Sequence, residues 1–105
     1  MVRMIVAFSV APTQTPGRDA EMVDAVAEAV RVVRESGLPN ETNAMFTLVE
    51  GEWDEVMAVV KAASEAVLAV SPRVSLVLKA DIRPGHKDQM TRKVRSVEER
   101  LKGER

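Results

Sequence analysis

Two stretches of the chain, residues 4–10 and 76–85, show a two-residue period in their side chains, which predicts strands. In residues 4–10 both sets of alternate positions are largely apolar, and a strand that is apolar on both faces is typical of the centre of a sheet. In residues 76–85, LVLKADIRPG, one set is apolar while the other carries Lys79, Asp81 and Arg83. The second strand is therefore predicted to bury one face and to present these three charged residues on the other.

Three other stretches carry apolar residues at helical spacing. The first follows Asp19 and ends at Ser36-Gly37, where glycine is suited to the left-handed position after a helix. The second begins near Glu52, stops at Ser71-Pro72 and places Trp53 on its apolar side, so Trp53 is predicted to be buried. The third, at residues 87–102, is rich in charge and is predicted to be a mostly solvated amphipathic helix.

Residues 40–51 resemble two short strands joined by a tight connection. The resulting order, β-α-β-β-α-β and a final helix, is that of the α+β ferredoxin-like fold, in which two helices cover one face of a four-stranded antiparallel sheet. We expect residues 1–105 to form a single domain of this kind. Its other face is open, and apolar residues there, including Ile5, Ala7 and Val77, predict a contact with another subunit or a ligand.

Composition narrows the possible functions. The chain has 15 Lys and Arg against 16 Asp and Glu, so its net charge of −1 gives no field that would attract nucleic acid. It has no cysteine, and its single histidine, His86, lies in a polar loop, so we expect neither a metal nor a cofactor. The N-terminal stretch is a poor signal peptide and no apolar run is long enough for a membrane span, so a cytoplasmic protein is expected.

Catalysis is not predicted, because no residue stands out as a positioned nucleophile or general base. Glu50 and Glu52 flank the start of the second helix, where carboxylates are favoured by the helix dipole without any further function. Asp81 and Arg83, two apart on one face of a strand, are also able to pair with each other. The pattern alone therefore leaves open whether these groups form a site or only stabilise the surface.

Three motifs resemble those of the thiamine-binding protein family, and the resemblance covers nearly the whole chain. The most specific is TLVEG, residues 47–51, which leads into the acidic helix start EWDEVM. The others are Arg73-Val74 followed by Lys79, Asp81 and Arg83, and the SVAP of residues 9–12. The chain departs from the family at Phe46, where glycine is frequent, and at PTQT, residues 12–15, where the family has a Pro-hydrophobic-Gly turn.

The resemblance implies a non-catalytic protein that binds thiamine or its hydroxymethylpyrimidine portion, as a carrier or sensor. It also implies a homo-oligomer, a dimer or more commonly a tetramer of paired dimers. The alternative is an oligomeric regulatory or interaction module that has no small-molecule ligand.

A pocket for an aminopyrimidine needs a hydrogen-bond acceptor, a few hydroxyl or amide partners and an apolar wall. A straight strand would point Thr47 and Glu50 to opposite faces, so they would converge only if Glu50 lies in a turn that Gly51 permits. We take Glu50 as the expected acceptor and Phe46 as a candidate wall. The predicted ligand-binding residues are Ser9, Asn43, Phe46, Thr47, Glu50, Lys79, Asp81 and Arg83.

Overall fold

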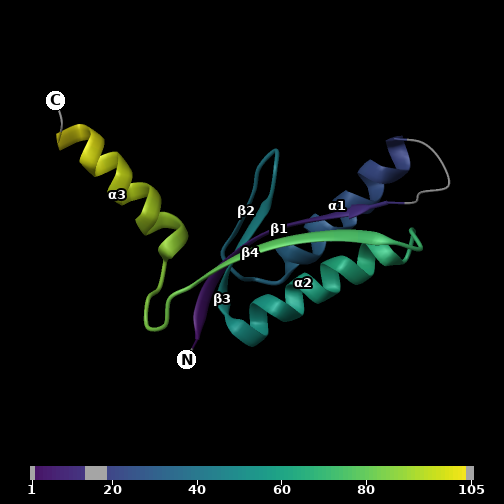
Figure 1. Ribbon diagram of the computed structural model, residues 1–105, viewed down its shortest axis with the longest axis horizontal. Coiled ribbons are helices and arrows are strands. Elements are labelled where there is room, and N and C mark those ends of the chain that lie inside the picture. The colour runs from purple at the N-terminus through teal and green to yellow at the C-terminus, as the bar shows by residue number, and fades with distance from the viewer. Residues whose placement is uncertain (1, 14–18, 104–105) are drawn as a thin grey trace.

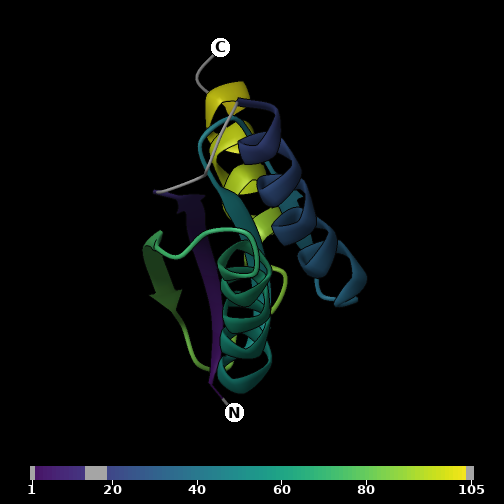
Figure 2. The same cartoon turned by 90° about the vertical axis from the view of Figure 1, so that its right-hand side faces the viewer.

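The computed structural model describes residues 2–13 and 19–103. In chain order the elements are β1 (Arg3–Pro12), α1 (Asp19–Glu35), β2 (Asn40–Thr42), β3 (Thr47–Glu52), α2 (Trp53–Leu68), β4 (Val74–Ile82) and α3 (Gln89–Gly103). The strands pair antiparallel in the order β2-β3-β1-β4, and α1 and α2 lie on the same side of this sheet (Figures 1 and 2). The fold is ferredoxin-like, as the sequence predicts.

The core lies between the sheet and the first two helices. β1 is a central strand, paired on one side with β3 and on the other with β4, which confirms the expectation drawn from its apolar composition. Its alternate residues from Met4 to Val10 are buried under α1 and α2, and Phe8 is only 2% exposed. We call this side the covered face, and the side that carries Ile5 and Ala7 the open face.

The first two helices lie close to where the sequence predicts them, but one residue predicted to be buried is exposed. Gly37, just after α1, has φ +80°, the left-handed conformation expected there. Trp53 is 45% exposed, so the prediction that it is buried is wrong. It is the first residue of α2 and lies at the margin of the core, whereas Val56 and Val60 further along the helix are buried.

The third helix projects from the body of the molecule (Figure 1). The radius of gyration is 15.7 Å, against about 13 Å for a compact chain of this length. Val94, Val97 and Leu101 on α3 are each more than half exposed, so the apolar stripe of this helix lacks a cover. None of the described helices is both long and apolar enough to span a bilayer.

Candidate binding site

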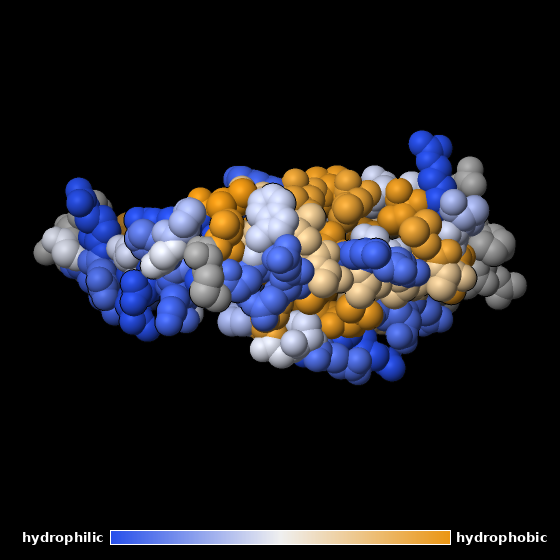
Figure 3. Space-filling view, turned by 90° about the horizontal axis from the view of Figure 1, so that it is seen from below, coloured by the Kyte–Doolittle hydropathy of each residue, from blue (hydrophilic) through white to orange (hydrophobic). Residues whose placement is uncertain are grey.

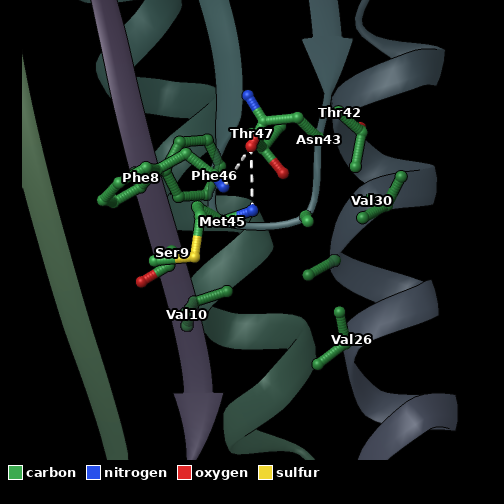
Figure 4. A pocket seen from close by; sticks show the side chains of 12 residues that line it. Phe8, Ser9, Val10, Val26, Val30, Thr42, Asn43, Met45, Phe46 and Thr47 are labelled. Carbon is green, nitrogen blue, oxygen red and sulfur yellow. Dashed lines mark hydrogen bonds between the residues drawn. The ribbon is translucent and has the colours of Figure 1, made fainter.

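A cavity of about 140 Å³ lies on the covered face where β2 and β3 are connected. Figure 4 shows side chains from β1, from α1 and from the β2–β3 connection surrounding this space, which we call the hairpin cavity. Its walls are mainly apolar. Its lining consists of Phe8, Ser9, Val10, Val26, Ala29, Val30 and residues 42–47.

Asn43 shapes the connection that closes this cavity. Its side-chain Oδ1 accepts hydrogen bonds from the backbone N–H groups of Met45 and Phe46, at 2.8 and 2.9 Å (Figure 4). Its own backbone N–H donates to the carbonyl of Phe46 at 3.0 Å. Asparagine suits this role because its short side chain bonds to nearby backbone in turns. The Asn43 oxygen is therefore occupied, whereas its side-chain NH₂ makes no hydrogen bond to any described residue.

Thr47 supplies a second polar group to the hairpin cavity. It is paired with Phe8 in the sheet and therefore faces the same, covered side. Its hydroxyl has no hydrogen-bond partner among the described residues. Ser9 also lines the cavity, but strand alternation turns its hydroxyl away from Val26 and Val30 (Figure 4).

Glu50 lies on the opposite face of the sheet from Thr47. β3 continues as a strand to Glu52, and Glu50 is paired with Ile5 on the open face. The turn on which convergence of Thr47 and Glu50 depended is absent, so the expected approach of these two residues does not occur. Gly51 serves another purpose: a Cβ there would lie 3.3 Å from Val56, because α2 packs closely over this position.

The carboxylate of Glu50 binds the N-terminus of α3. The backbone N–H groups of Gln89 and Met90 donate to its two oxygens at 2.8 and 3.2 Å, and Glu50 is only 2% exposed. The first N–H groups of a helix lack partners within the helix, and the dipole favours a negative charge beside them. Glu50 therefore acts as a helix cap, but for the third helix rather than for the second helix that its sequence position suggests.

The charged residues of β4 lie on the open face, as the sequence predicts. The prediction that β4 buries its other face is wrong, because Leu76, Leu78 and Ile82 are exposed on this edge strand. Lys79 is paired with Ala7 and Asp81 with Ile5. With the first turns of α3 these residues border a second cavity, of about 280 Å³. Asp81 forms an ion pair with Lys93 of α3 rather than with Arg83.

The ion pair affects the protonation of Asp81. Its hydrogen bond with Lys93 holds the pKa of the Asp81 carboxyl below its usual range, and the charges of Arg83 and Lys79 act in the same direction. Arg83 itself donates from Nη1 to the side-chain oxygen of Gln89 at 3.4 Å. Together with Glu50, these contacts attach the start of α3 to the open face.

The eight predicted residues thus form two groups. Asn43, Phe46 and Thr47 meet at the hairpin cavity, which Ser9 lines without directing its hydroxyl into it. Glu50, Lys79, Asp81 and Arg83 lie near the start of α3 on the other face. The sequence reasoning did not anticipate the contribution of α1, whose Val26 and Val30 close the hairpin cavity. In the sequence these two valines follow the same helical spacing as the core residues of α1, so no local signal marks them as the wall of a cavity. Gln14 and Thr15 of the PTQT stretch lie outside the described residues.

Comparisons with known proteins agree with the resemblance noted in the sequence. The sequence profile of the thiamine-binding protein family matches residues 6–98. A UPF0045 protein of Mycobacterium bovis is 57% identical over 99 residues, which cover 93% of this chain and 94% of the relative. A UPF0045 protein of Methanocaldococcus jannaschii is 32% identical over 99 residues, or 94% of this chain and 96% of the relative.

Solved structures show the same architecture. The crystal structure of the Methanocaldococcus jannaschii protein superposes with a TM-score of 0.79 over 92% of this chain and 97% of that chain, at 32% identity. A Thermotoga maritima protein named for thiamine biosynthesis or salvage superposes with a TM-score of 0.70 over 84% of this chain and 92% of that chain. Its identity is 24%, so this second likeness concerns the fold alone.

Proposed function

Because the chain belongs to the thiamine-binding protein family, we propose that it binds thiamine or hydroxymethylpyrimidine, without catalysis, as a carrier or sensor. The proposed site is the hairpin cavity. The observation that carries this proposal is its size and lining: about 140 Å³ with apolar walls, below the ~300–1,000 Å³ of pockets that enclose whole ligands. Such a space suits one aromatic ring, so the pyrimidine would enter while the rest of thiamine stays outside.

The polar groups of the cavity complement an aminopyrimidine. The exocyclic amine of the ring donates hydrogen bonds and the ring nitrogens accept them. The Thr47 hydroxyl is available both as an acceptor and as a donor, since it has no partner among the described residues. Phe46 and Phe8 supply apolar surface for the ring.

Thermal unfolding with added ligand tests this proposal. Saturating ligand stabilises a protein by RT ln(1 + [L]/Kd), about 2.7 kcal/mol at a hundredfold excess over Kd. We expect hydroxymethylpyrimidine and thiamine to raise the midpoint, and the thiazole half of thiamine to leave it unchanged. No shift with either pyrimidine would overturn the proposal and favour the interaction module.

A cavity-filling variant locates the site. Val26 lines the hairpin cavity, whereas Val23 lies on the same helix, is also exposed and does not line it. We expect Val26→Trp to abolish the ligand-induced shift and Val23→Trp to retain it. Equal responses of the two variants would place the ligand elsewhere.

We also propose that the protein assembles as a homo-oligomer, a dimer at least and a tetramer by preference. The edge strand β4 supports this, because Leu76, Val77 and Ile82 are each 45% exposed or more. Figure 3 shows apolar surface over the body of the molecule, whereas the end from which α3 projects is mainly hydrophilic. A long apolar edge strand without cover is an expected site of association.

Light scattering tests the assembly. We expect a mass of at least two chains at micromolar concentration, and Val77→Asp should lower it because the charge would be buried without a partner in the interface. Ala58→Asp, on the exposed side of α2, is the control and should leave the mass unchanged. A monomeric wild type would contradict this part of the proposal.

A further inference from the structure

A group of cations gathers at the end of the sheet far from the hairpin cavity. Arg3 and Arg83 are neighbours on adjacent strands, where the Arg83 N–H donates to the Arg3 carbonyl at 3.0 Å. Strand alternation turns both side chains to the open face. Like charges in such positions repel each other.

Two of the carboxylates near this end bind groups other than Arg3 and Lys87. Glu50 is bound to the start of α3, and Asp81 pairs with Lys93. Glu52 lies 3.6 Å from Nη1 of Arg3, which leaves the Nε–H of Arg3 without a partner. That Nε is buried, and a buried donor without an acceptor is unfavourable. Because the Nε is closed to solvent while 23% of the Arg3 side chain is exposed, an acceptor from outside would reach the terminal N–H groups of Arg3.

The turn between β4 and α3 adds further donors beside Arg3. A cavity of about 610 Å³ is lined by Arg3, Glu52, Pro84, Gly85 and Lys87; we call it the Arg3 corner. The ammonium of Lys87 and the backbone N–H groups of Gly85 and Lys87 donate to no described residue. Gly85 has φ +79° and open space around its α-carbon, so the turn is accessible to a ligand. Turn N–H groups with left-handed residues commonly form anion-binding concavities.

We propose that the Arg3 corner binds the phosphate group of a small phosphate monoester. The guanidinium of Arg3 offers its terminal N–H groups to phosphate oxygens, and Lys87 adds a point charge. The cavity volume falls within the range of organic-ligand pockets, which leaves room for a substituent on the phosphate. Arg3 and Phe8 are five residues apart along one extended strand, about 17 Å, so this site is separate from the hairpin cavity.

A titration followed by ¹H–¹⁵N NMR tests the proposal. Inorganic phosphate and phenyl phosphate are added at constant ionic strength, and the reporters are the Arg3 Nε–H and the backbone N–H groups of Gly85 and Lys87. We expect saturable shifts at these three groups with both probes and tighter binding of phenyl phosphate. Equal affinities would overturn the monoester part, and the absence of saturable shifts at millimolar concentrations would overturn the site.

Matched variants distinguish phosphate binding at a defined site from non-specific attraction to positively charged residues. Lys87→Gln removes an exposed charge that has no partner among the described residues, and Arg3→Lys keeps the charge while removing the planar guanidinium. We expect each to weaken phosphate binding several-fold, up to about tenfold for the loss of a charge-assisted hydrogen bond. Arg95→Gln, on the exposed surface of α3, should leave the affinity within about twofold. Equal losses in all three would show only non-specific attraction and overturn the proposal.

Discussion

The two faces of the sheet are held by different interactions, and the pair Thr47 and Glu50 shows the contrast within one strand. On the covered face, β1 and β3 bury apolar side chains under α1 and α2, and the hairpin cavity lies at the end of this packing. On the open face, a few polar contacts attach only the first turns of α3. We conclude that substitutions on the covered face act on global stability or on ligand binding, whereas those on the open face act on α3.

The largest expected effect comes from the covered core. Phe8→Ala removes a side chain that is 2% exposed and should lower the free energy of unfolding by about 3–5 kcal/mol. On α3, which is attached to the open face, Val97→Ala truncates a side chain that is 60% exposed and should change it by about 0.5 kcal/mol or less. Denaturant unfolding measures both values. Similar losses from the two variants would break the distinction between the faces.

A smaller loss of stability is expected from substituting Glu50, which attaches α3 to the open face. Glu50→Gln removes the charge that accepts the N–H groups of Gln89 and Met90, which should weaken the docking of α3 by about 1–3 kcal/mol. Hydrogen exchange at these two amides should therefore accelerate about tenfold or more. Glu41→Gln, an exposed residue that borders the same face, is the control. Unchanged exchange in Glu50→Gln would show that the carboxylate does not hold the helix.

The smallest effect concerns the exposed ion pair of Asp81 and Lys93. The pKa of Asp81 is lowered in the folded protein, so its stabilising contribution is present above the unfolded value of about 3.9 and is lost as the pH falls through the folded value. Lys93→Gln removes the largest cause and should raise the pKa of Asp81 toward its ordinary value. An NMR titration of the Asp81 carboxyl measures this. If the pKa of Asp81 is the same in Lys93→Gln as in the wild type, the charges of Arg83 and Lys79 account for the lowered pKa instead.

Much of the fold followed from local patterns. The central position of β1 was predictable from apolar residues on both faces, and the bounds of α2 from its spacing and its stop at Ser71-Pro72. Trp53 was misplaced because helical spacing gives the side of a helix but not where the core ends along its axis. A residue on the apolar side of a first turn remains exposed if nothing extends over it.

The site was less predictable because it depends on contacts between distant segments. The partner of Glu50 lies 39 residues further along the chain, and no local pattern links a strand carboxylate to the start of another helix. Strand alternation alone, followed strictly from Thr47, would have placed Glu50 on the opposite face. The hypothesis of a turn at Gly51 replaced this simpler rule, and the tight packing of Gly51 under α2 shows why glycine is there.

Calorimetric titration with hydroxymethylpyrimidine of the wild type, Thr47→Val and Glu50→Gln tests the central claim most directly. The claim is that the ring binds on the covered face, in the hairpin cavity, and that Glu50 serves α3. Thr47→Val should weaken binding by about 0.5–1.5 kcal/mol, the scale of one neutral hydrogen bond, while Glu50→Gln retains the affinity of the wild type. The opposite result, loss of affinity in Glu50→Gln with no change in Thr47→Val, would contradict the account and place the ligand on the open face.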